Sequence, residues 1–132
     1  MTARFLLDTH VVVQWLSAPR KLSSNQVRVM REAERQAEPV TLSAYSLVEI
    51  AMLARGSRKV SGSIDRIFSE LEENPAFRIL PITIPIAVDA RALNLLRDPG
   101  DRTIVATARV HGLRLLTSDQ RIIDSKLVSV ID

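Results

Sequence analysis

Four acidic residues stand where a carboxylate can take part in chemistry: Asp8, Glu49, Asp101 and Asp119. Asp8 and Asp119 each follow a short apolar run that predicts a buried strand, and Asp101 lies in the first turn of a predicted helix. Glu49 interrupts an otherwise apolar helical stretch, where a carboxylate is costly unless it is paired or binds a cation. Carboxylates that converge on one pocket repel each other, and hard oxygen ligands favour Mg²⁺ or Mn²⁺. Such an ion activates water and stabilises charge on a phosphate, which is the chemistry of metal-dependent nucleases.

Each of these acids also has a purely structural explanation. Asp8 and Asp119 at strand ends are typical helix caps or turn formers. The stretch Asp98-Pro99-Gly100-Asp101 predicts a capped helix start with proline at the first helical position, where Asp101 favours the helix dipole. Glu49 would then point outward or form a salt bridge. For any acid taken singly, both explanations stay open.

Short apolar strands alternate with amphipathic helices along the chain. Strands are predicted at residues 4–7, 40–42, 77–82, 113–117 and 127–131. Helices are predicted at residues 11–16, 25–36, 44–54, 61–73, 85–96 and 99–111, with a short helical turn at 120–123. This alternation predicts an α/β fold, a three-layer α/β/α domain with a central, mainly parallel sheet of four to five strands. In such sheets ligands bind beyond the carboxyl ends of the strands, where Asp8 and Asp119 lie.

Composition narrows the class of protein further. A chain of 132 residues is expected to form a single domain, residues 1–132, with an aliphatic core because only 4% of its residues are aromatic. The sequence contains no cysteine, which excludes disulfides, thiolate zinc sites and a cysteine nucleophile. A net charge of +3 mildly favours an anionic partner. No apolar run approaches the ~20 residues of a membrane span, so we expect a cytoplasmic protein without membrane association.

Four short motifs carry the acids in a fixed order along the chain. They are Leu6-Leu7-Asp8-Thr9-His10, Ser46-Leu47-Val48-Glu49-Ile50-Ala51, Asp98-Pro99-Gly100-Asp101-Arg102 before an Ile-x-Ala-x-Ala helix, and Leu115-Leu116-Thr117-Ser118-Asp119. Together, and in this order, they resemble the PIN-domain ribonucleases. More narrowly, they resemble the VapC-type toxins of prokaryotic toxin–antitoxin modules. The resemblance spans essentially the whole chain.

The resemblance implies Mg²⁺- or Mn²⁺-dependent cleavage of RNA by a compact α/β/α domain. Asp8, Asp101 and Asp119 would be the main metal ligands, and Glu49 would hold the second side of the site or orient the attacking water. The implied partners are an RNA substrate, a small antitoxin protein that blocks the site, and a second copy of the chain in a homodimer. The alternative is a metal-binding PIN-like module that binds RNA or protein without cutting. A phosphotransfer domain is disfavoured, because His10 stands where a dehalogenase-type site has its second aspartate.

Three positions depart from the family pattern without removing a carboxylate. Val48 stands where relatives often carry tryptophan, Gln14 precedes the single Trp15 where an aromatic pair is common, and Gly100 replaces a frequent bulky residue. We expect these departures to affect the shape of the pocket and the RNA preference. Asp98 matches a frequent family residue, and we assign it mainly to capping.

Other polar residues have two possible roles each. Thr9 and Thr117 either donate hydrogen bonds to the site acids or cap helices, and His10 either shuttles protons or packs on the sheet. Arg102 either contacts phosphate or, as we expect, forms a salt bridge between elements. A basic cluster either follows the RNA backbone or is simply solvated: Arg55, Arg58 and Lys59.

Overall fold

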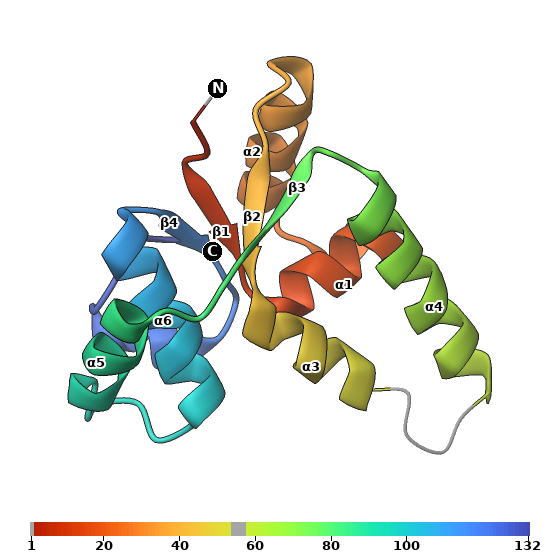
Figure 1. Ribbon diagram of the computed structural model, residues 1–132. Coiled ribbons are helices and arrows are strands. Elements are labelled where there is room, and N and C mark those ends of the chain that lie inside the picture. The colour runs from red at the N-terminus through yellow and green to blue at the C-terminus, as the bar shows by residue number, and fades with distance from the viewer. Residues whose placement is uncertain (1, 54–57) are drawn as a thin grey trace.

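Figure 1 shows the computed structural model of the chain, in which helices lie on both sides of a central sheet. It describes residues 2–53 and 58–132, the side chains of residues 58–62 excepted. The strands are β1 (Phe5–Leu7), β2 (Val40–Ser43), β3 (Phe77–Leu80), β4 (Arg114–Leu116) and β5 (Val130–Ile131). The helices are α1 (Thr9–Ser17), the 3₁₀ turn η1 (Pro19–Lys21), α2 (Ser24–Arg35), α3 (Ala44–Met52), α4 (Arg58–Glu73), α5 (Ile84–Ala92), α6 (Pro99–His111) and α7 (Gln120–Ser125). As far as the structure describes them, these helices are too short or too polar to cross a bilayer.

The strands form one five-stranded sheet in the order β3-β2-β1-β4-β5, and every pair of neighbours is parallel. In β1, Leu6 lies opposite Thr41 of β2 on one side and Leu115 of β4 on the other. The order reverses at β1, because the chain builds outward to β3 and then returns to β4 and β5. The crevice at such a reversal is where open α/β sheets bind ligands. The predicted fold class is confirmed, and the sheet is entirely parallel.

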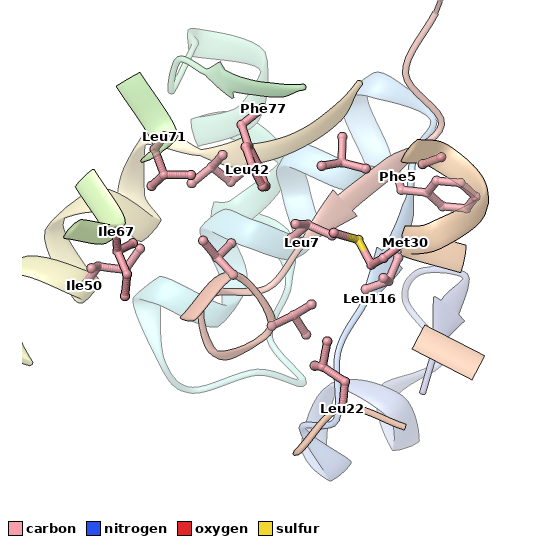
Figure 2. Close-up of a cluster of buried hydrophobic side chains, with 14 of the residues drawn as sticks. Phe5, Leu7, Leu22, Met30, Leu42, Ile50, Ile67, Leu71, Phe77 and Leu116 are labelled. Carbon is pink, nitrogen blue, oxygen red and sulfur yellow. The ribbon is translucent and has the colours of Figure 1, made fainter. Parts of the chain in front are cut away.

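The core has two parts, one on each face of the sheet. Phe5 and Leu7 pack in the cluster that includes residues of α1 to α4, whereas Leu6 between them packs in the cluster of α5 to α7. Figure 2 shows the first cluster, where Leu7, Met30 and Leu116 meet although they lie far apart in the sequence. Burial on both faces explains why the central strand β1 is a continuous apolar run instead of an alternating pattern.

Polar caps at the carboxyl edge of the sheet start the helices that carry the acids. Asp8 and Ser43 accept hydrogen bonds from N–H groups in the first turns of α1 and α3, at 2.8 and 3.0 Å. Asp98 and Asp119 do the same for α6 and α7, at 3.1 and 2.9 Å. The capping roles predicted for Asp8, Asp98 and Asp119 are therefore confirmed. Capping occupies only part of each carboxylate, so it leaves oxygens available for chemistry.

Several predicted elements are longer than the observed ones. The helix predicted at residues 85–96 ends at Ala92, because Leu93 leaves the helical conformation with φ −84° and ψ 65°. The strand predicted at 77–82 ends before Pro81, which has no N–H to donate to a ladder. The strand predicted at 127–131 is reduced to its last two core residues. Apolar runs mark buried segments, but the hydrogen-bonding pattern decides how much of each is regular.

Candidate active site

Asp8 is the most deeply buried of the four predicted acids, with 6% of its surface exposed. Its backbone N–H donates to the carbonyl of Leu116 at 3.0 Å and so extends the pairing of β1 with β4. Its Oδ2 accepts a hydrogen bond of 2.7 Å from the hydroxyl of Thr117. The hydroxyl oxygen of Thr117 in turn accepts from the N–H of Asp119 at 3.1 Å. Thr117 therefore links two of the acids, and its predicted role as a donor to a site acid is confirmed.

Glu49 projects from α3 and is half-buried. The hydroxyl of Thr9 donates to Glu49 Oε1 at 2.6 Å and lies 2.8 Å from the buried hydroxyl of Ser46. Among the described contacts Glu49 is thus held by a hydroxyl and not by a salt bridge, and it lines a cleft instead of pointing away from the protein. Burial raises the pKa of Glu49, and the negative charge of Asp8 adds to that effect, while the Thr9 hydroxyl opposes it.

The start of α6 packs closely on α3 at a glycine. Gly100 is buried, and a Cβ atom added there would lie 2.7 Å from Cε1 of Tyr45 and 3.3 Å from Oε2 of Glu49. The Tyr45 ring therefore takes up the space that a larger side chain at position 100 would need. This close approach brings Asp101, in the first turn of α6, to the same cleft as Glu49.

Asp119 follows β4 and is paired with an arginine that we did not predict. Arg121 donates from Nε to Asp119 Oδ1 at 3.3 Å and from Nη2 to Asp119 Oδ2 at 3.2 Å. The same Nη2 lies 3.7 Å from Oδ2 of Asp101. A guanidinium thus bridges two of the four acids.

His10 joins the loops that follow β1 and β4. The N–H of Ser118 donates to His10 Nε2 at 3.0 Å, and His10 Nδ1 lies 3.5 Å from Asp8 Oδ2. Because Nε2 accepts, a neutral His10 ring carries its proton on Nδ1, toward the Asp8 carboxylate. This bridge was not expected from the sequence, since it connects residues more than a hundred positions apart.

All four predicted acids line one cleft of about 600 Å³ at the carboxyl edge of the sheet. Asp8 and Glu49 come from the first fifty residues, and Asp101 and Asp119 come from the last third of the chain. The rest of the lining includes Tyr45, Lys21 and an apolar wall. Three exposed residues of that wall come from α3 and its end: Val48, Met52 and Leu53.

The carboxylates in this cleft differ in their pKa. Burial raises the pKa of Asp101 to about 6, and the nearby carboxylates of Asp98, Asp119 and Asp8 add to that effect. Burial also acts to raise the pKa of Asp119, but the hydrogen bonds from Arg121 outweigh it, so that the pKa of Asp119 is lowered. At neutral pH the cleft therefore holds mutually repelling negative charges that Arg121 partly offsets.

We expect Asp101 to make the metal-free protein more stable in mild acid than at neutral pH. Its pKa is raised from 3.8 to about 6 on folding, so between these values the folded protein binds a proton that the unfolded chain releases. The resulting stabilisation is complete below the lower value and is lost as pH rises through the upper one. Urea unfolding with EDTA, from about pH 4 to about pH 8, should show the stability of Asp101→Asn gaining on wild type as pH rises. A difference between the two proteins that is independent of pH would contradict this expectation.

The side chains that line the cleft are chemically suited to bind a hard divalent cation. The cleft offers carboxylate oxygens, which suit Mg²⁺ and Mn²⁺, and their mutual repulsion is the condition that such an ion relieves. Within the part of the chain that the structure describes, no three His, Asp or Glu side chains are already arranged around a single ion position. Binding of such an ion would therefore require the carboxylates to move closer together.

The remaining predicted residues are placed as follows. Arg102 donates from Nε to the carbonyl of Leu96, so the predicted salt bridge is instead a hydrogen bond to the main chain. The side chains of the basic cluster Arg55, Arg58 and Lys59 lie outside the described residues. Arg121 and Tyr45 were missed. Arg121 had a weak signal, since it lies two positions after an acid at a helix start, but the contact of Tyr45 with α6 had none.

Comparison with known proteins shows the family of the chain. A model of the PIN domain matches residues 5–126. The chain therefore belongs to the PIN-domain family. Among VapC-type proteins of that family, it is 35% identical over 120 residues to Ribonuclease VapC22 of Mycobacterium tuberculosis, covering 89% of this chain and 88% of that protein.

Solved structures share the fold along nearly the whole chain. FitAcB from Neisseria gonorrhoeae is 25% identical with a TM-score of 0.68, covering 97% of this chain and 96% of that one. A toxin–antitoxin complex from Klebsiella pneumoniae is 23% identical with a TM-score of 0.69, covering 96% of this chain and 95% of that one. At that identity, the second likeness concerns the fold alone.

Proposed function

We propose that this protein is a Mg²⁺- or Mn²⁺-dependent endoribonuclease and the toxin of a type II toxin–antitoxin module. The observation that carries the proposal is that four carboxylates from four separate elements line one cleft at the carboxyl edge of the sheet. RNA as the substrate is supported by the relative Ribonuclease VapC22. The single PIN domain is proposed to carry the whole activity.

In this proposal Asp8, Asp101 and Asp119 hold the ion, and Glu49 orients the attacking water. A bound ion would lower the pKa of water and offset negative charge on the phosphate. Hydroxyl groups of the protein orient two of the carboxylates in advance, because Thr117 holds Asp8 and Thr9 holds Glu49. The raised pKa of Glu49 makes it a stronger base than an exposed carboxylate, which suits it to accept a proton from water.

The proposed protein partners are a small antitoxin and a second copy of the chain. The fold shared with the toxin–antitoxin complex of Klebsiella pneumoniae is consistent with the first. The exposed apolar wall beside the acidic cleft suits a partner segment that covers the site: Val48, Met52 and Leu53. Co-expression with the neighbouring reading frame and size exclusion tests both partners, and a stable monomer without a co-purifying chain would contradict them.

Asp8→Asn is expected to lower RNA cleavage at least about 100-fold, because it removes a proposed metal ligand. Asparagine keeps one oxygen that can still cap α1, so the variant should fold. The assay is cleavage of total RNA with Mg²⁺, with Mn²⁺ and with EDTA. Asp124→Asn is the matched control, since Asp124 is exposed on α7 and accepts a hydrogen bond only from Gln120 of its own helix among the described contacts.

Two outcomes count against the proposal. If Asp8→Asn cleaves as fast as wild type, the assignment of the site is wrong. If wild type retards RNA on a gel but produces no new ends with either metal, the protein is a binding module and not a nuclease.

A further inference from the structure

We propose that Arg121 is an internal counter-ion that holds the cation position between Asp101 and Asp119, and that a divalent metal must displace it to bind. The inference rests on the metal site of the proposed function. It gives Arg121 a role in setting the metal affinity of the protein.

The first support is the geometry of the guanidinium group. Its Nε and Nη2 donate to the two oxygens of Asp119 at 3.3 and 3.2 Å, and Nη2 also lies 3.7 Å from Oδ2 of Asp101. The backbone N–H of Arg121 donates to Oδ1 of Asp119 at 2.9 Å as the cap of α7. Both oxygens of Asp119 are therefore already engaged by Arg121, and an ion has to replace part of this pairing.

The second support is the difference in solvent exposure between the arginine and the two acids that it contacts. The side chain of Arg121 is 76% exposed, whereas those of Asp101 and Asp119 are 16% and 20% exposed. The acids are thus held by the fold while the arginine reaches in from solvent. Ion pairs with a largely exposed partner are only modestly stabilising and exchange readily, so a divalent ion can take the place of the guanidinium.

The third support is the charge balance of the cleft. Three other arginine–acid pairs in the described structure involve none of the four cleft acids: Arg4 with Glu38, Arg35 with Glu32, and Arg109 with Asp89. Among the four acids, Arg121 is paired with Asp119 at 3.2 Å and with Asp101 at 3.7 Å. Its positive charge therefore stabilises the metal-free cleft and works against a second cation in the same place.

The test is calorimetric titration of Mn²⁺ into wild type, Arg121→Gln, Arg121→Lys and Arg114→Gln. Arg121→Gln is expected to bind Mn²⁺ about tenfold more tightly, which is the size of effect expected for removing a unit charge a few ångströms from the ion in a solvated site. Arg121→Lys keeps the charge without the two-armed contact, and we expect an intermediate affinity. Arg114→Gln removes the same charge at the other end of β4, where Arg114 contacts Ser129, and should bind as wild type does.

Thermal unfolding gives a second readout that does not depend on cleavage. With EDTA, Arg121→Gln is expected to melt below wild type, because the acids lose their counter-ion, and saturating Mn²⁺ should remove the difference. If wild type binds Mn²⁺ measurably and Arg121→Gln binds it equally well or more weakly, the proposed role of Arg121 is overturned, but the metal site is not. Absence of Mn²⁺ binding by wild type at millimolar concentration would overturn the metal site itself.

Discussion

Asp101→Asn is expected to abolish metal-dependent RNA cleavage and at the same time to stabilise the metal-free protein at neutral pH. The loss of cleavage should be at least about 100-fold, because a proposed ligand of the ion is lost. The gain in stability follows from the charge balance, since Asp101 has its pKa raised to about 6 by burial and by neighbouring carboxylates. The capping of α6 is unaffected, because Asp101 contributes only its backbone N–H to that contact.

Cleavage rate and the free energy of unfolding in EDTA measure these two effects separately. Asp124→Asn, the same chemical change outside the cleft, should alter neither of them. A variant that is inactive only because it is less stable than wild type would contradict the prediction, since lost activity would then report misfolding. Retained cleavage would remove Asp101 from the site.

Gly100→Ala is expected to destabilise the protein by about 1–2 kcal/mol. The added methyl group overpacks the site, and the higher helix propensity of alanine offsets only part of that cost. The added Cβ would lie 2.7 Å from the Tyr45 ring, so the ring has to move, and it would crowd Asp98 Oδ2 at 3.1 Å and Glu49 Oε2 at 3.3 Å. Displacement of Glu49 should lower cleavage by about 10- to 100-fold, since small misplacements of catalytic groups are costly. Urea unfolding and the RNA cleavage assay measure the two effects.

The partner of this steric conflict is Tyr45, which a second substitution can test. In the background of Tyr45→Leu, which removes the ring, Gly100→Ala should cost much less stability than it does alone. A double-mutant cycle measures this coupling. If the two substitutions are simply additive, the Tyr45 ring is not what requires glycine at position 100.

The sequence was sufficient to single out the four acids that line the cleft, because each has a local signature. Asp8 and Asp119 end apolar runs, and Asp101 follows a recognisable cap and proline. Glu49 was identified by its apolar neighbours, although the structure leaves Val48 and Met52 of that stretch exposed. Glu49 does line the cleft, as predicted, but the premise that its apolar neighbours are buried is only partly correct.

The features that sequence could not predict are contacts between distant segments. The bridge from His10 to Ser118 and the packing of Tyr45 over Gly100 join elements that only the folded sheet brings together. The direction of the Arg121 side chain is of the same kind, because α7 must be placed before its guanidinium can reach Asp101. Such contacts follow from packing and not from the spacing of residues along the chain. They also determine how the four acids interact.

The most direct test of a metal-dependent nuclease site in this cleft is the chemistry of the RNA ends that the purified protein produces. If water is the nucleophile, the products carry a linear phosphate and a free hydroxyl, and a 2′-deoxy substitution at the cleaved position does not block the reaction. We expect this result with Mg²⁺ or Mn²⁺, and no cleavage with EDTA or with Asp8→Asn. Products ending in a 2′,3′-cyclic phosphate, formed equally well in EDTA, would contradict the proposal.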